Sequence, residues 1–225
     1  MNHFYFVILS LQHNMEKEYV KDVYEKIAKR FSETRSGYYW NAITDFIKSL
    51  EPYSLIADAG CGNGRYMNLN AKFGLKHQFI GFDFCEGSTI ICKQRGFDIC
   101  VGDTRMIPYR NGVFDASISI AVIHHLDTEE KRIQACREIV RITKPRYGRI
   151  FIQVWASDVK KTKKFTPIND NNDYYVSWYI DKDTSVKRYY HLFTKDEIID
   201  IAEKSGIIIE KCLYDHENWI IIGTC

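Results

Sequence analysis

The sequence lacks the cysteine spacing that a zinc cluster or a disulfide framework requires. Its 225 residues include seven cysteines, an odd number, and no two of them form a C-x-x-C pair. We therefore expect no metal site. Unpaired thiols are typical of a reducing compartment, so the chain is predicted to belong to the cytoplasm or the nucleus.

An excess of charge of one sign is also missing. The 31 lysines and arginines and the 29 aspartates and glutamates give a net charge of +2, so any surface for nucleic acid must come from local clustering. Long apolar runs are absent as well. Residues 4–9 (FYFVIL) are too few to span a bilayer, and neither a basic segment nor a signal-peptide cleavage site accompanies them. We expect no membrane partner.

The pattern of apolar residues predicts one domain. Residues 1–15 are expected to be an N-terminal extension outside the fold, because their apolar run shares no register with the helical pattern that begins at Glu16. Residues 16–225 are expected to form the domain. Their length and a hydrophobic fraction of 45% suffice for one buried core, and no internal repeat is visible.

A glycine-rich turn follows a short apolar strand at residues 55–57. It reads DAGCGNG and contains Asp58, Gly60, Gly62 and Gly64. Glycine permits a tight turn and lets backbone N–H groups approach a ligand, and the N-terminus of the following helix favours acceptor groups. The spacing differs from the G-x-G-x-x-G of a dinucleotide site. It resembles motif I of class I S-adenosylmethionine (SAM) methyltransferases, although a turn without a ligand is the alternative for the glycines alone.

Two acids at the ends of later strands strengthen the cofactor hypothesis. Asp83 ends a predicted strand about twenty residues past the glycines, where a carboxylate meets a ribose diol. Asp103 ends the next strand, and in the methyltransferases the corresponding acid lies beside the adenine amino group. A nicotinamide dehydrogenase is the alternative. The predicted cofactor-binding residues are Asp58, Gly60, Gly62, Gly64, Asp83, Asp103 and Ala121.

The order of predicted elements indicates the fold class. Strands and helices alternate from residue 55 to 154, which is typical of a parallel sheet with helices on both faces, and residues 207–213 and 218–223 predict a closing strand pair. We expect an α/β fold of the Rossmann-like class I SAM methyltransferase type, with a mostly parallel seven-stranded sheet. Residues 156–187 break the alternation, and their polar runs predict a long mobile insertion.

Four further segments resemble the eukaryotic tRNA wobble-uridine carboxymethyl methyltransferases of the fungal stand-alone type. They are residues 16–20 (EKEYV), 31–35 (FSETR), 118–125 (ISIAVIHH) and 188–193 (RYYHLF). In animals the related domain is fused to an AlkB-type oxygenase. The resemblance covers residues 16–225 and implies that SAM methylates 5-carboxymethyluridine at the anticodon wobble position, giving 5-methoxycarbonylmethyluridine. Residues 176–178 read VSW where the family tends to have VPW, which puts the lid conformation in doubt.

This chemistry needs a cationic clamp more than a general base. A carboxylate with a pKa of about 4 is already ionised at neutral pH, and Arg35 and Arg188 are the candidates to bind it, because a guanidinium pairs with a carboxylate bidentately. His124 is expected to border the methyl-transfer point. Tyr189 and His191 would contact the uracil flipped out of the anticodon stack, with only one of the adjacent pair Tyr189 and Tyr190 in the site.

Two partners are implied. One is the tRNA anticodon stem-loop, for which basic runs at residues 131–149 and 160–164 offer phosphate contacts. The other, implied by the resemblance, is a small zinc-binding activator that forms a heterodimer by adding strands at the sheet edge near residues 97–102 (FDICVG). The alternatives are a methyltransferase for quinone-type or sterol-type small molecules and a non-catalytic RNA-binding protein with a degenerate pocket.

Overall fold

The computed structural model describes residues 15–34 and 39–225 and contains a seven-stranded sheet in the order β3-β2-β1-β4-β5-β10-β9. Five strands run parallel, and β10 runs antiparallel to both of its neighbours. The predicted Rossmann-like, mostly parallel sheet is therefore confirmed. Its strands are β1 (Leu55–Ala59), β2 (Gln78–Asp83), β3 (Ile99–Val101), β4 (Ala116–Ile120), β5 (Arg149–Trp155), β9 (Ile208–Asp215) and β10 (Asn218–Thr224).

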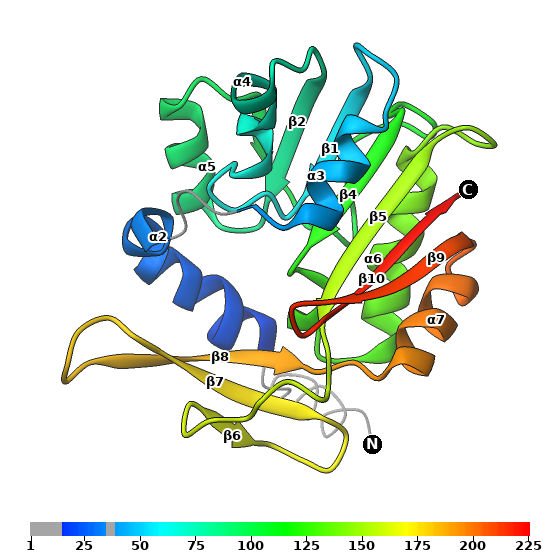
Figure 1. The fold of residues 1–225 in the computed structure, drawn as a ribbon. Coiled ribbons are helices and arrows are strands. Elements are labelled where there is room, and N and C mark those ends of the chain that lie inside the picture. The colour runs from blue at the N-terminus through cyan, green and yellow to red at the C-terminus, as the bar shows by residue number, and fades with distance from the viewer. Residues whose placement is uncertain (1–14, 35–38) are drawn as a thin grey trace, which may run out of the picture.

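Helices cover both faces of this sheet (Figure 1). One face packs against α3 (Asn41–Lys48), α4 (Leu69–Phe73) and α5 (Glu86–Gln94), and the other against α6 (Glu129–Ile142) and α7 (Lys195–Lys204). Every residue of β4 is buried, as expected for a parallel strand that is covered on both sides. Along β5, Phe151 joins the α3 side of the core and Ile152 joins the α6 side, because successive side chains of a strand point to opposite faces.

The predicted insertion at residues 156–187 and the four residues after it form a small antiparallel sheet with loops between its strands, so the expectation of one long loop was wrong. It contains β6 (Phe165–Pro167), β7 (Asp173–Tyr179) and β8 (Ser185–His191), in that order. Aromatic and β-branched residues favour strands, and β7 reads DYYVSWY. The polar runs that suggested a loop lie between the strands instead. Val176 and Tyr190 form a separate apolar cluster with Val159 and Leu192.

An N-terminal arm joins the two sheets. It comprises a π-helical segment, η1 (Lys17–Lys21), and α2 (Asp22–Thr34), and α2 packs against both α5 and β8 (Figure 1). Glu16 is buried and forms ion pairs with Arg105 at 3.0 Å and Lys131 at 2.9 Å. Tyr175 donates a hydrogen bond to the sulfur of Met15 at 3.7 Å. Residues 1–14 lie outside the described part, so the expectation of an extension stays a prediction.

Within residues 15–34 and 39–225, no helix is long and apolar enough to cross a membrane.

Candidate active site

A cavity of about 250 Å³ lies at the carboxyl ends of β1, β2, β4 and β5, where open α/β sheets bind ligands. Its walls come from the glycine turn after β1, the N-terminal arm and the inserted sheet. The glycine turn and the end of β2 contribute backbone and the carboxylates of Asp58 and Asp83, which we call the carboxylate end. Strand β8 and α2 contribute the guanidinium of Arg188 and the rings of Tyr190 and Tyr24, which we call the aromatic end. The two ends therefore favour ligand groups of different chemistry.

The glycine turn leaves no room for side chains at two of its positions. Gly60 has a φ of +81°, and a Cβ there would lie 2.3 Å from a methyl carbon of Val122. A Cβ on Gly64, at a φ of +72°, would lie 2.6 Å from the ring of Phe97. Gly62 has open space above it. The turn therefore requires glycine for its backbone and presents a bare surface to the cavity.

Asp83, the last residue of β2, holds this turn in place through a hydrogen bond. Its carboxylate accepts hydrogen bonds from the backbone N–H groups of Gly62 at 2.8 Å and Cys85 at 2.9 Å. Burial raises the pKa of Asp83, and these two bonds act in the opposite direction. A carboxylate has about four acceptor positions, so Asp83 keeps further capacity toward the cavity that it lines.

Asp58 is a buried carboxylate that lacks a full set of partners. Its side chain is at the cavity wall, and among the described residues Oδ2 accepts no hydrogen bond. Burial and the neighbouring charge of Asp83 raise its pKa to about 8. A buried pair of carboxylates is stabilised by a cation or by donor groups, so this end of the cavity favours a positively charged ligand.

Asp103 and Ala121 complete the carboxylate end. Arg105 binds Asp103 through Nε at 3.0 Å and Nη2 at 2.6 Å. Burial would raise the pKa of Asp103, but these bonds outweigh it and the pKa is lowered. Ala121 has a φ of +60°, and its N–H donates to the carbonyl of Gln153 at 2.9 Å. A non-glycine residue in this conformation is strained, and here it turns the chain away at the end of β4.

Arg188 dominates the aromatic end. It is 4% exposed, and its guanidinium lies over the rings of Trp178 and Tyr190, both at 5.1 Å. Nη1 donates to the hydroxyl of Tyr24 at 3.1 Å. Burial opposes its charge, but the oxygens of Tyr190 and Tyr24 offset this and the pKa is raised. Among the described residues no carboxylate lies within ion-pair distance, so this buried cation favours an anionic ligand.

Hydrogen-bond partners fix the tautomer of His125, which belongs to a 3-10 turn, η3 (Ile123–His125). Its Nδ1 lies 2.8 Å from the carbonyl oxygen of Tyr189, and its Nε2 lies 3.1 Å from the hydroxyl of Tyr24. A carbonyl only accepts, so Nδ1 carries the hydrogen. Burial lowers the pKa of His125 to about 3. Nε2 therefore accepts from Tyr24, whose oxygen in turn accepts from Arg188.

Several predicted site residues do not reach the cavity. His124 is fully buried, accepts a hydrogen bond from the N–H of Trp155 at 3.3 Å and packs against the ring of Tyr190. Tyr189 and His191 point to the opposite face of β8 and enter a separate polar cluster. The structure instead places His125 and Tyr190 in the wall. Direct contact of His124, Tyr189 and His191 with substrate stays a prediction.

Arg35, the other predicted clamp, lies outside the described residues. Tyr24 and Phe31 of α2 line the cavity. The alternation along β8 is a signal that would have found Tyr190, since it is two residues from Arg188 and shares its face. Among the described residues, no group of three His, Cys, Asp or Glu side chains could hold a metal ion.

Comparison with known proteins identifies the class. The profile of the methyltransferase domain family matches residues 57–152. A SAM-dependent methyltransferase from Methanosarcina mazei superposes with a TM-score of 0.66 at 16% identity, covering 82% of this chain and 96% of its own. A chain from the complex of the Haloferax volcanii Trm112 methyltransferase activator with a methyltransferase gives 0.69 at 12% identity, covering 91% and 96%. The protein is a class I SAM-dependent methyltransferase.

The tRNA (carboxymethyluridine(34)-5-O)-methyltransferase of Schizosaccharomyces pombe is 33% identical over 227 residues, which cover 92% of this chain and 96% of that protein. The chain belongs to this family, as its motifs had suggested. Relatives of the same description from Xenopus tropicalis (33% identity, 92% of this chain) and Arabidopsis thaliana (43%, 69%) are longer. The chain spans 41% and 38% of their lengths, respectively.

The residues at the carboxylate end fit SAM. The cofactor is a cation with a ribose diol, and the unsatisfied Oδ2 of Asp58 and the spare acceptor positions of Asp83 match these two features. The bare backbone at Gly62 permits close approach of a ligand. Asp58 would therefore hold the positive end of the methionine portion, and Asp83 the ribose.

Substitution Asp83→Ala is expected to lower SAM affinity at least tenfold. It removes charge-assisted hydrogen bonds that contribute about 1.5–3 kcal/mol each, and about 1.4 kcal/mol corresponds to tenfold in affinity. Titration calorimetry on folded protein measures the effect. Asp98→Ala, which removes an exposed carboxylate after α5 that does not line the cavity, is the matched control. Equal affinity in the two variants would contradict the assignment of Asp83.

Proposed function

We propose that this chain methylates the carboxylate of 5-carboxymethyluridine at the wobble position of tRNA, with SAM as the methyl donor. The observation that supports it most directly is Arg188, a buried guanidinium without a described counter-ion in the same cavity as the cofactor residues. A substrate carboxylate would neutralise it. The relatives from S. pombe, X. tropicalis and A. thaliana act on this nucleoside by name, whereas a quinone-type or sterol-type substrate offers no such anion.

The residues present suit a reaction that needs alignment and no proton transfer. Bound SAM supplies a methyl group on a sulfonium centre. The substrate carboxylate, with a pKa of about 4, is ionised at neutral pH, and His125 cannot act as a base because both of its ring nitrogens are engaged. Arg188 would orient the carboxylate, and alignment alone can contribute about 7–11 kcal/mol.

Aromatic rings beside Arg188 would hold the base. Trp155 and Tyr190 lie with ring centroids 4.7 Å apart, and Tyr190 lies 4.5 Å from His125. RNA-binding proteins commonly stack unpaired bases on such rings. An enzyme that modifies an anticodon base must take the base out of its stack, and this aromatic wall is suited to receive it.

The inserted sheet offers the better surface for tRNA phosphates. Most cations of the first basic run already have protein partners: Lys131 pairs with Glu16, Arg141 with Glu138, Lys144 with Asp115 and Arg149 with Glu210, and Arg132 is buried. The lysines at positions 160, 161, 163 and 164 are exposed and precede β6. We assign phosphate contacts to these lysines.

The edge of β3 is the proposed contact for a small zinc-binding activator in a heterodimer. Strand β3 is the outer strand of the large sheet, and Val101 there is 47% exposed. Ile90 and Met106 are exposed as well. An uncovered edge strand with apolar residues favours association, and a similar fold occurs in a complex with the Trm112 activator.

The seven free cysteines support a location in the cytoplasm or nucleus.

Nucleoside mass spectrometry tests the activity directly. The full chain with SAM is expected to convert 5-carboxymethyluridine into 5-methoxycarbonylmethyluridine in tRNA from a strain that lacks the wobble methyltransferase. Asp83→Ala, with its weakened SAM binding, should give less ester at limiting SAM. Absence of the ester from all tRNA, with SAM bound normally, would contradict the proposed substrate.

Substitution of Arg188 tests the clamp. Arg188→Ala should bind SAM normally and lose about a hundredfold or more in ester formation, because an unpaired buried carboxylate is destabilised by several kcal/mol. Arg188→Lys keeps the charge but not the bidentate geometry, and we expect an intermediate loss. Lys187→Ala, an exposed neighbour on β8, is the control. Near-normal turnover in Arg188→Ala would place the carboxylate elsewhere.

Substitution Val101→Glu tests the partner surface. We expect it to weaken a one-to-one complex with the activator, because a carboxylate in an apolar interface is strongly disfavoured. Co-purification and sedimentation measure the complex, and Tyr147→Glu, at an exposed aromatic residue outside β3, is the control. A soluble, fully active chain that gains nothing from the activator would refute the interface.

A further inference from the structure

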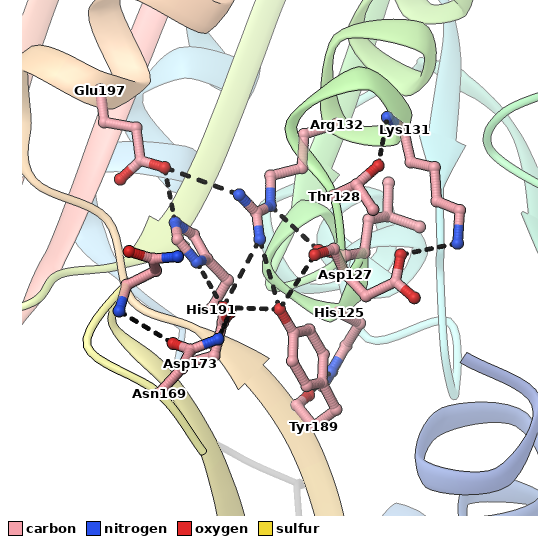
Figure 2. A network of polar contacts seen from close by, with 12 residues as sticks. His125, Asp127, Thr128, Lys131, Arg132, Asn169, Asp173, Tyr189, His191 and Glu197 are labelled. Atoms are coloured by element: carbon pink, nitrogen blue, oxygen red, sulfur yellow. Dashed lines mark hydrogen bonds and ion pairs between the residues drawn. The ribbon is translucent and has the colours of Figure 1, made fainter. Parts of the chain in front are cut away.

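A cluster of polar and charged side chains lies where β7 and β8 meet α6 and α7 (Figure 2). Asp173 comes from β7, Tyr189 and His191 from β8, Arg132 from α6 and Glu197 from α7. All are buried except Glu197, whose side chain is 28% exposed. None of them lines the cavity, so the proposed function leaves this cluster without a role.

His191 has a carboxylate at each ring nitrogen (Figure 2). Nδ1 lies 2.7 Å from Oδ1 of Asp173, and Nε2 lies 2.6 Å from Oε1 of Glu197. An ionised carboxylate only accepts, so both nitrogens donate and the ring is an imidazolium. Burial by itself lowers the pKa of His191, but the bonds with Asp173 and Glu197 outweigh it and the pKa is raised.

The charges of the cluster balance only with this proton in place. Arg132 lies 3.7 Å from Asp173 and 3.6 Å from Glu197, and Tyr189 donates to Asp173 at 2.6 Å. The cluster thus has two carboxylates and two cations. One positive neighbour, Arg132 on α6, opposes the proton on His191. His124 on η3 also faces His191, but burial lowers the pKa of His124 well below its usual range, so its ring is neutral when His191 titrates.

We propose that His191 is a positioning residue: clasped between Asp173 and Glu197, it holds β8 against α6 and α7 so that Arg188 and Tyr190 enter the cavity. This inference rests on the proposed function for the role of Arg188. Strand β8 belongs to the small sheet, so contacts such as these set its position relative to the large one. Because side chains alternate along a strand, fixing one face of β8 fixes the other.

The contact of His191 with Asp173 and Glu197, called the clasp below, has a definite pH dependence. The folded-state pKa of His191 is raised above its value of about 6.5 in an unfolded chain. The protonated ring therefore contributes fully to the stability of the folded state below about pH 6.5. This contribution is lost as the pH rises through the folded-state pKa of His191. One ring nitrogen then faces a carboxylate as an acceptor, and the cluster becomes net negative. Among the described residues, the hydrogen bonds of Asp83 involve no member of the cluster, so SAM affinity should not follow this titration.

The substitution Glu197→Gln tests the clasp, because it removes the charge of residue 197 and hardly changes the shape of its side chain. The amide oxygen still accepts from Nε2, but one negative charge is gone, and loss of an opposite charge this close should lower the pKa of His191 by about one unit or more. Nitrogen-15 NMR of the His191 ring in the full chain measures this. The alkaline limb of kcat/KM for carboxymethyluridine tRNA should shift down by a similar amount, with SAM affinity unchanged. Glu203→Gln, exposed on the same helix, is the control.

Two outcomes overturn the proposal. The first is a His191 ring with only one protonated nitrogen at pH 7 in the wild type. This measurement does not need the variant, so it tests the proposal even if Glu197→Gln fails to fold. The second is a variant whose turnover, melting temperature and SAM affinity fall together, because that pattern indicates a general structural role. If the wild type esterifies no tRNA, the proposed function fails. The titration of the His191 ring and the hydrogen exchange of the β8 amides would still show whether His191 holds β8 in position.

Discussion

The burial of Arg188 without a described carboxylate partner is the constraint on which the rest of this structure depends. An uncompensated guanidinium is unfavourable in a protein interior, and here its Nη1 rests on Tyr24 from the arm while aromatic rings surround it. Asp58 and Asp83 lie at the other end of the same cavity. The site is thus polarised, with carboxylates at the end that fits SAM and a guanidinium at the end proposed for the substrate.

The position of Arg188 in the cavity depends on the position of the inserted sheet, because β8 carries this residue. Strand β8 presents Arg188 and Tyr190 on one face and Tyr189 and His191 on the other, so the strand belongs both to the cavity and to the cluster that fastens it. The arm also contributes to the cavity, and Glu16 fixes it to the methyltransferase core by pairing with Arg105 and Lys131. The aromatic end of the cavity is therefore assembled from segments far apart in the sequence.

The sequence predicted the parts of the site that follow from local patterns. The glycine turn and the acids at strand ends are positioned by one β-α-β unit, so Asp58, Gly60 and Asp83 could be assigned to the cavity without coordinates. The choice between His124 and His125, or between Tyr189 and Tyr190, depends on a 3-10 turn and on strand register, which composition does not reveal. The inserted strands were missed because polar runs flank them.

The lack of a described carboxylate partner for Arg188 also bears on the release of product. For the proposed substrate, esterification converts an anion into a neutral group, so the feature that attracts the nucleoside to Arg188 disappears when the methyl group arrives. An ester oxygen still accepts a hydrogen bond, but it no longer compensates a buried positive charge. Arg188 therefore discriminates between substrate and product, and the same residue that favours entry of the acid favours departure of the finished tRNA.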